Sequence, residues 1–277
     1  MKNILTIDVE DYFQVENFKK RVKFADWENY EGRVSKNTYA ILDILEGAKA
    51  HATFFILGWV AERYPRLVKD IHAKEHEVAS HGYSHEPIYD QSMEDFQADL
   101  KKSKLVLEDM ISEKIRGYRA PSFSMTEKTI SALDVLDEEG FEYDSSIFPV
   151  HRDRGGMVNA KRFPHKLEQG NSSIWEIPIS TMRLLGQNIP FSGGGYFRLL
   201  PYWLVKKGIE ALNKENQPAI VYLHPWEIDP EQPRINGGII GNFRHYINLD
   251  KTERKLEKLL NDFEFGTVRS CLDSYKS

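Results

Sequence analysis

Short apolar runs alternate with amphipathic helical segments along this chain, and that alternation restricts the fold more than any other feature. Three of the runs, at residues 4–7, 52–57 and 219–223, are apolar almost throughout. Runs of this kind are typical of strands that are covered on both faces of a sheet. Strands separated by helices favour a mainly parallel sheet or barrel with the helices outside. The sequence therefore predicts an α/β fold.

The remaining elements follow from periodicity and from helix start and stop signals. Further strands are expected at residues 75–79, 115–121, 141–144 and 174–178. Helices are expected at residues 34–46, 58–74 (with Pro65 starting a second helix), 92–110, 126–139, 201–213 and, as the last regular element, 250–262. Segments 150–172 and 228–248 are rich in Gly, Pro, Asn and Arg and are expected to be long loops.

Composition narrows the class of protein and its partners. The 277 residues, 41% apolar and 29% charged, are ordinary for a globular protein with a sizeable core. A net charge of −5 without a basic stripe argues weakly against nucleic acid as a partner. Cys271 is the only cysteine, so neither an intramolecular disulfide nor a thiolate metal cluster is possible. No apolar stretch approaches a membrane span and no signal-peptide core is present, so we expect a cytoplasmic protein unless a signal sequence has been removed.

Two groups of candidate metal ligands stand out. His81 and His85 are four residues apart, so on a helical turn both imidazoles could bind one metal ion. Three carboxylates, Asp8, Glu10 and Asp11, directly follow the strand at residues 4–7. Such carboxylates would repel one another if they were buried without a cation or an arginine nearby. An exposed acidic loop is the alternative.

Further polar residues follow other predicted strands, namely Arg119, Asp144 and His224. The carboxyl ends of parallel strands meet at one edge, where barrel enzymes build their active sites. One carboxylate and two imidazoles can bind zinc or a similar ion, while a second carboxylate acts as general base and a histidine protonates the leaving nitrogen. Arg119 would hold the base carboxylate by a bidentate pair. This set of groups suits hydrolysis of an amide.

At these positions the chain resembles the NodB-like polysaccharide deacetylases of carbohydrate esterase family 4, which remove N-acetyl groups from amino sugars with one divalent metal ion. The family's His-Ser/Thr-x-x-His motif is matched by residues 81–85, with Gly82 in place of the hydroxyl residue. The Arg-x-Pro turn is similar to residues 119–121, the Asp-Ser segment to residues 144–146, and the Leu-His motif to residues 223–224. The resemblance implies that His224 donates a proton and that Arg119 and Asp144 belong to the catalytic group.

The first motif departs from the usual Thr-Phe-Asp-Asp and runs from Thr6 to Asp11. By resemblance to distant members with an Asp-x-Glu form, Asp8 is expected to be the base and Glu10 the metal ligand, with Asp11 as the alternative ligand. Residues two apart on an extended chain point the same way, so Asp8 and Glu10 can face one site.

The resemblance also implies the architecture and the ligands. It implies a deformed (β/α)7-type barrel in a single catalytic domain over residues 1–277, with a core of about 1–230 and a C-terminal extension of about 231–277 that is typical of an exopolysaccharide-associated bacterial subgroup. The metal is expected to be Zn²⁺, with Co²⁺, Mn²⁺ or Ni²⁺ as alternatives. The substrate is expected to be an N-acetylated oligo- or polysaccharide, or its lipid-linked precursor.

For substrate binding, Pro121 and Ser122 are expected to line the groove. Tyr196, in a Gly-rich turn, and Trp226 are expected to form a sugar-binding wall, or else a loop turn and a core aromatic. Two other functions compete with deacetylation: an allantoinase-type hydrolase of a small cyclic amide or ureide, and a catalytically inactive carbohydrate-binding protein. A missing ligand triad would favour the first, and a missing base or acid the second.

Overall fold

The computed structural model describes residues 1–151, 155–170 and 172–276, and within them eight strands run parallel in one sheet: β11 (Phe265–Gly266) pairs with β1 beside the main row, and the other seven form that row. In spatial order those seven are β10 (Ile220–Leu223), β1 (Asn3–Val9), β2 (Thr53–Ile56), β3 (Glu77–Ser80), β4 (Gly117–Tyr118), β5 (Tyr143–Asp144) and β7 (Ser172–Glu176). The predicted succession of strands and helices is confirmed for this core.

Side chains alternate along each strand between two apolar layers. In β1, Ile4 belongs to a cluster inside the barrel, whereas Leu5 belongs to the larger cluster beneath the helices. Phe55 and Phe54 of β2 are divided in the same way. Because both faces of each strand are apolar, these strands appear in the sequence as continuous apolar runs rather than as alternating ones.

The sheet curves into a barrel that is closed irregularly between β7 and β10. The backbone N–H of Ser180 donates to the carbonyl of Ile220 at 3.4 Å, and the N–H of Tyr222 donates to Ser192 at 3.1 Å. A single parallel bridge joins Gly193 to Tyr222. The expected deformed (β/α)7-type barrel is therefore confirmed, with short irregular segments in place of a regular closing ladder.

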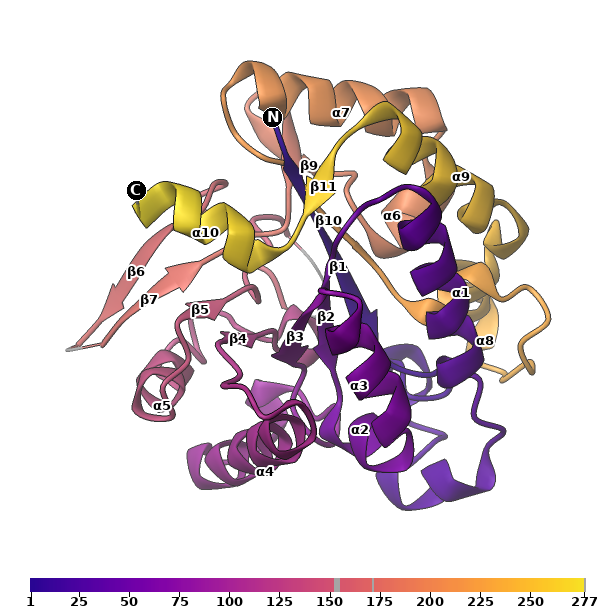
Figure 1. Ribbon diagram of the computed structural model, residues 1–277, viewed down its shortest axis with the longest axis vertical. Coiled ribbons are helices and arrows are strands. Elements are labelled where there is room, and N and C mark those ends of the chain that lie inside the picture. Colours follow the sequence, from indigo (N-terminus) through magenta and orange to yellow (C-terminus); the bar gives the residue numbers. More distant parts are fainter. Residues whose placement is uncertain (152–154, 171, 277) are drawn as a thin grey trace.

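Helices surround the barrel, with α1, α2 and α3 along one side and α4 and α5 along another (Figure 1). The helices are α1 (Val34–Gly47), α2 (Gly58–Arg63), α3 (Pro65–Ala73), α4 (Met93–Ile111), α5 (Ala132–Glu138), α6 (Gly194–Leu199), α7 (Tyr202–Lys214), α8 (Gly238–Tyr246), α9 (Leu249–Asp262) and α10 (Val268–Lys276). Among the residues that the structure describes, none of these helices is long and apolar enough to cross a membrane.

Both segments expected to be loops contain regular structure. In the first, β6 (His165–Gln169) pairs antiparallel with β7, and this hairpin extends away from the barrel (Figure 1); residues 152–154 and 171 lie outside the described residues. The second segment contains α8. Strand β6 was not predicted because it is a polar edge strand without an apolar run. Helix α8 was not predicted because it includes two glycines, which are uncommon inside helices. A separate hairpin joins β8 (Thr181–Leu184) to β9 (Gln187–Pro190).

The helix expected at residues 126–139 begins later, at Ala132. The hydroxyl of Thr129 accepts the N–H of Thr126 at 2.8 Å and donates to the carbonyl of Ser124, so the preceding residues form turns instead.

The chain also continues past α9, which was expected to be the last element. β11 (Phe265–Gly266) pairs with the start of β1, and Val268 and Leu272 of α10 pack into the inner barrel cluster. The N–H of Val268 donates to Thr53 Oγ1 at 2.8 Å. This end of the chain thus covers the amino ends of the strands, opposite the edge expected to carry the site. The single-domain boundaries remain a prediction.

Candidate active site

Asp8 and Glu10 lie at the carboxyl end of β1 and face one cavity of about 770 Å³. Asp8 is the penultimate residue of β1, and Glu10 is the first residue after the strand. The backbone N–H of Glu10 donates to the carbonyl of Asp8 at 3.0 Å, so the chain turns at Val9 rather than staying extended, yet both side chains line the cavity as predicted. Both residues are only 2% exposed. Two carboxylates buried this closely need positive partners, which the neighbouring strands supply.

Arg119, fully buried behind the cavity, is the positive partner of Asp8. Its Nη1 donates to Asp8 Oδ1 at 2.6 Å and to Thr6 Oγ1 at 2.8 Å. Its Nε and Nη2 donate instead to the carbonyl and hydroxyl oxygens of Ser145, at 3.0 and 2.8 Å. The expected bidentate pair is therefore a single contact, because Ser145 occupies the other side of the guanidinium. Arg119 fixes one oxygen of Asp8 and leaves Oδ2 for the cavity.

His81 and His85 follow β3 in an irregular turn, so the expectation that they share a helical turn was wrong. Both Gly82 and His85 have positive φ, at 75° and 56°, which no α-helix allows. The turn nevertheless brings the two imidazoles together, with ring centroids 5.3 Å apart. The four-residue spacing therefore predicted correctly that the two imidazoles lie together, although it predicted a helix where the structure has a turn.

Asp99 of α4 holds that turn in place. Its carboxylate accepts the backbone N–H groups of Tyr83 at 2.7 Å and Ser84 at 3.0 Å, and also the Ser84 hydroxyl at 2.5 Å. A Cβ atom on Gly82 would lie only 3.0 Å from Asp99 Oδ2. Glycine at the position of the family's hydroxyl residue therefore fits both the positive φ and the close approach of Asp99.

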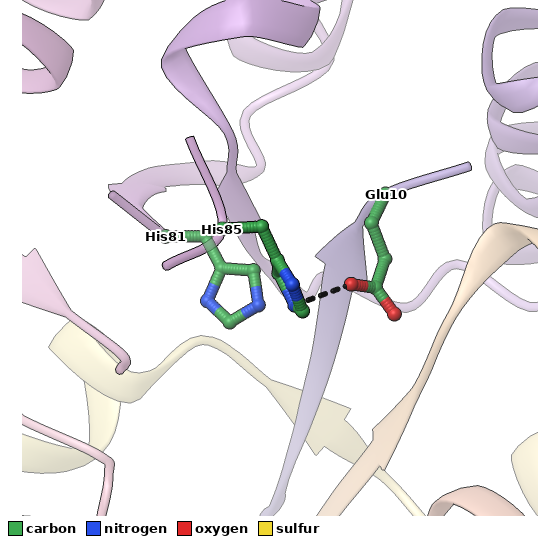
Figure 2. A group of neighbouring side chains, drawn as sticks. All are labelled: Glu10, His81 and His85. Atoms are coloured by element: carbon green, nitrogen blue, oxygen red, sulfur yellow. Dashed lines mark ion pairs between the residues drawn. The ribbon is translucent and has the colours of Figure 1, made fainter. Parts of the chain in front are cut away.

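Glu10, His81 and His85 together offer three ligand atoms within 4.8 Å of one another, and all three residues are buried. Figure 2 shows the side chains converging from the end of β1 and from the segment after β3. Two imidazole nitrogens and one carboxylate oxygen form a donor set that zinc and similar divalent ions prefer.

Local contacts prepare these atoms for a cation. His81 Nδ1 lies 2.8 Å from the carbonyl of Arg119, so Nδ1 carries the proton and Nε2 is left with a free lone pair. Burial lowers the pKa of His81 to about 4, which favours the neutral ring. Glu10 Oε2 is buried and lies 2.7 Å from His85 Nε2, so a carboxylate oxygen and an imidazole nitrogen face one another as two ligands of one cation would. The residues thus fit a divalent metal ion.

The charge of Glu10 is stabilised by its surroundings. Burial alone would raise its pKa, but the neighbouring imidazoles of His85 and His224 outweigh burial and hold the pKa well below its usual range. The indole Nε1 of Trp226 also donates to Glu10 Oε1 at 3.3 Å. Glu10 is therefore ionised, as a metal ligand must be.

Asp11, the alternative ligand, is used elsewhere. Its Oδ2 accepts the N–H groups of Arg33 at 2.7 Å and Val34 at 2.9 Å, which begin α1, and its Oδ1 accepts the N–H of Tyr12. Burial raises the pKa of Asp11 to about 6 despite these hydrogen bonds. Asp11 thus caps a helix that is distant in sequence and lies outside the group of converging ligand atoms.

His224 follows β10 and faces both carboxylates from across the cavity. Its Nε2 lies 3.4 Å from Glu10 Oε1 and 3.9 Å from Asp8 Oδ2. Burial would lower the pKa of His224, but Glu10, Glu227 and Asp8 outweigh burial and raise it to about 9. The imidazole is thus placed and charged by the same carboxylates that line the site.

Glu227 and Arg198, to which the sequence analysis gave no role, fix the far side of His224. Glu227 Oε2 lies 3.2 Å from His224 Nδ1 and accepts the backbone N–H of His224 at 3.1 Å, while Oε1 accepts Arg198 Nε at 2.8 Å. Arg198 also donates to three carbonyls, those of Arg244, His245 and Ile247. Arg198 lies just after the glycines at 193–195, and Glu227 ends the His-Pro-Trp-Glu segment at 224–227. Charged residues in these two segments are the sequence signal that could have revealed the pair.

Asp144, expected in the catalytic group, does not reach the cavity. It is fully buried, and its carboxylate accepts the hydroxyl of Ser146, whose oxygen in turn accepts the N–H of Ala120 at 2.7 Å. Burial raises the pKa of Asp144 to about 6, and burial beside Asp144 raises that of Glu176 well above its ordinary value. Asp144 therefore supports the turn after Arg119 from behind.

The residues expected to bind substrate are divided between the cavity and the interior. Ser122 and Tyr196 line the cavity, whereas Pro121 is buried in the turn. Trp226 also lines the cavity but is only 5% exposed, because its ring is stacked against His224 at 5.2 Å and His245 at 4.1 Å. Of the two readings left open for Trp226, the structure favours the core aromatic, because no free indole face remains for a sugar.

Two family models together match most of the chain. Residues 24–141 match the polysaccharide deacetylase family, and residues 145–273 match a domain of unknown function (DUF3473). A peptidoglycan-N-acetylglucosamine deacetylase of Bacillus cereus is 33% identical over 122 residues, 44% of this chain and 54% of that protein. An uncharacterized 30.6 kDa protein of Geobacillus stearothermophilus is 34% identical over 197 residues, 61% of this chain and 68% of that protein.

Among solved structures, the fold is similar to that of a putative polysaccharide deacetylase from Mycobacterium smegmatis. The TM-score is 0.63 at 22% sequence identity, over 98% of this chain and 88% of that one. The chain spans between about a third and about half the length of the first curated relatives that it matches.

Proposed function

The chain belongs to the polysaccharide deacetylase family, and from that premise we propose that it is a metal-dependent hydrolase that removes N-acetyl groups from amino sugars of a polysaccharide or its lipid-linked precursor. One observation carries the proposal: three converging ligand atoms, the carboxylate of Asp8 and the imidazole of His224 all meet at one cavity. Association with exopolysaccharide biosynthesis remains a prediction.

Glu10, His81 and His85 would hold the metal ion, which is expected to be Zn²⁺. When bound, such an ion polarises a carbonyl oxygen and lowers the pKa of water toward neutrality. The contact of His81 Nδ1 with the carbonyl of Arg119 orients the ring for this role.

Asp8 is the proposed general base. Oδ1 is fixed by Arg119, so Oδ2 is the oxygen that can take a proton from the attacking water. Arg119 does not line the cavity and acts as a positioning residue that holds the carboxylate of Asp8 in place.

His224 is the proposed general acid. Its Nε2 faces the cavity and its Nδ1 faces Glu227, so Nε2 is the atom that can protonate the sugar nitrogen as the amide C–N bond breaks. The new C–O bond comes from water, and the products are acetate and a free amino sugar. Glu227 and Arg198 are positioning residues for this imidazole.

The geometry favours this proposal over its two rivals. The ligand triad, whose loss would point to an allantoinase-type hydrolase, is intact, and so are the base and acid that an inactive binding protein would lack. The discriminating experiment offers the purified protein N-acetylated chitooligosaccharides and, separately, allantoin, and measures acetate and free amine. We expect acetate and amine in equal amounts from the oligosaccharides alone; turnover of allantoin alone, or of neither, would overturn the proposal.

A further inference from the structure

Trp226 packs its indole against two imidazole rings at the cavity wall. The ring centroid of His224 lies 5.2 Å from that of the indole, with 21° between the ring planes, and that of His245 lies 4.1 Å away, with 13° between the planes. Trp226 lines the cavity that contains the candidate metal ligands, yet it is only 5% exposed. A buried indole stacked on the proposed general acid is placed to orient that acid.

The indole N–H holds one oxygen of the proposed metal ligand Glu10. Trp226 Nε1 donates to Glu10 Oε1 at 3.3 Å, whereas the other oxygen, Oε2, lies 2.7 Å from Nε2 of His85. The indole therefore fixes the rotation of the carboxylate and keeps Oε2 directed at the second ligand. Hydrogen bonds of this kind orient ligating carboxylates in metal sites generally.

The same N–H competes with the general acid for Glu10 Oε1. Nε2 of His224, the atom that is proposed to protonate the leaving nitrogen, lies 3.4 Å from that oxygen. A proton held between Glu10 and His224 would not be available to the substrate. By occupying Oε1, the indole N–H favours the arrangement in which His224 Nε2 faces the cavity.

His245 supports the indole from helix α8. It is fully buried and is the only buried residue of that helix. Its Nε2 lies 2.7 Å from Gln232 Oε1, while Gln232 Nε2 donates to the carbonyls of Trp226 and Asp229, both at 2.8 Å. Because the amide of Gln232 directs its oxygen at the imidazole, Nε2 of His245 carries the proton. His245 and Gln232 thus hold both the ring and the backbone of Trp226.

Stability alone does not account for a histidine at position 245. Its Nδ1 is buried and has no hydrogen-bond partner among the described residues. A buried nitrogen without a partner costs free energy, and an aliphatic side chain, the usual choice for the buried face of a helix, would avoid that cost. The flat face on the indole and the bond to Gln232 are what the imidazole contributes here.

We propose that Trp226 is a positioning residue for deacetylation, which keeps the metal ligand Glu10 and the general acid His224 in fixed positions relative to each other, and that His245 holds its indole in place. The inference rests on the proposed function. The acid, the indole and the supporting histidine all lie in residues 145–273, so the segment that matches a domain of unknown function contributes a wall of the active site.

The test replaces Trp226 by Phe, which keeps an aromatic ring against His224 but has no N–H for Glu10. Trp59→Phe is the matched control, because Trp59 is 8% exposed and does not line the cavity. For wild type and both variants, calorimetry measures the zinc dissociation constant of the metal-free protein. Acetate release from N-acetylated chitooligosaccharides at saturating zinc gives kcat and KM, and urea unfolding gives the stability.

For Trp226→Phe we expect the zinc dissociation constant to rise and kcat at saturating zinc to fall, each by roughly ten- to a hundredfold. KM should stay near wild type, because the buried indole has no free face for a sugar. Trp59→Phe should lose stability as well, with zinc affinity and kcat near wild type. Unchanged zinc affinity or unchanged kcat in Trp226→Phe, or equal effects on both in the two variants, would overturn the inference.

His245→Ala tests the support of the indole separately. If His245 acts through Trp226, its loss lowers zinc affinity and kcat in the wild-type background but adds less than about threefold to the effects of Trp226→Phe. Losses that multiply in the double variant would overturn the role of His245. Where His245→Ala does not fold, Gln232→Leu removes the partner of the imidazole and takes its place in the cycle.

Zinc binding separates this inference from the proposed function. A wild-type protein that binds zinc more tightly than Trp226→Phe but releases no acetate would refute the deacetylase function and support the link between Trp226 and Glu10. Acetate release at the same rate from wild type and Trp226→Phe would support the function and overturn the inference.

Discussion

The guanidinium of Arg198 in α6 contacts the carboxylate of Glu227, with Nε 2.8 Å from Oε1, and both side chains are almost completely buried. Glu227 in turn lies against His224 Nδ1 at 3.2 Å. Because Arg198 is itself held by three backbone carbonyls, this ion pair fixes the orientation of the proposed general acid through the Nδ1 edge of its ring.

Replacing Glu227 by Gln should impair turnover more than binding. The amide keeps the size of the side chain but removes the charge that stabilises the protonated imidazole, so we expect kcat to fall by roughly ten- to a thousandfold while KM and metal content stay near wild type. Steady-state kinetics with metal analysis checks this. The exposed Glu231→Gln serves as control and should behave as wild type; a Glu227 variant with unchanged kcat would remove Glu227 from the mechanism.

The Arg198–Glu227 ion pair also predicts that the free energy of unfolding decreases at low pH. Burial would raise the pKa of Glu227, but Arg198 and His224 outweigh it and lower the pKa from 4.5 to about 2. The stabilisation is therefore complete above about pH 4.5 and is lost as the pH falls through about 2, a change on the order of 3 kcal/mol. Urea unfolding between pH 6 and pH 2 should show a steeper loss of stability for wild type than for Glu227→Gln. Parallel curves would contradict the prediction.

Asp8→Asn should separate metal binding from catalysis. Asparagine keeps the shape of the side chain and can still contact Arg119, but it cannot accept a proton, so turnover should fall by about 10²–10⁴-fold with the metal retained. Metal content and acetate release from the same sample decide the matter. A near-normal rate would transfer the role of base to another carboxylate.

Glu10→Gln and Asp11→Asn should have opposite effects although the two residues are neighbours. Glu10 contributes to the converging ligand atoms, so Glu10→Gln should lose the metal. Asp11 accepts three backbone N–H groups, so Asp11→Asn should keep the metal but destabilise the fold by about 1–3 kcal/mol. Calorimetric zinc titration and urea unfolding measure both quantities, and loss of metal in the Asp11 variant alone would reverse the assignment.

The barrel was predictable because its strands are apolar on both faces, and the residues after these strands were correctly expected at one edge. The local backbone conformations of the site residues were harder to predict from the sequence. His81 and His85 meet through a turn stabilised by Asp99, a residue distant in sequence, and spacing alone suggested a helix instead. Similarly, Asp11 and Glu10 are indistinguishable in the sequence, and only the position of α1 beside Asp11 separates their environments.

Partners supplied by tertiary contacts were missed for the same reason. Glu227 becomes a partner of His224 only because Arg198, from a separate helix, lies on its other side. Asp144 follows a strand like the other site residues, but its side chain points to Ser146 and away from the cavity. Sequence position placed these residues at the correct edge of the barrel, and it could not specify the direction of each side chain.

The central claim is that this chain hydrolyses N-acetyl groups with a metal ion held by Glu10, His81 and His85. The most direct measurement is the metal content of the purified protein together with acetate release from N-acetylated oligosaccharides before chelation, after chelation and after zinc is restored. We predict about one divalent ion per chain and acetate release that chelation abolishes and zinc restores. Undiminished acetate release from the metal-free protein, or failure of the restored protein to retain any metal, would contradict the account.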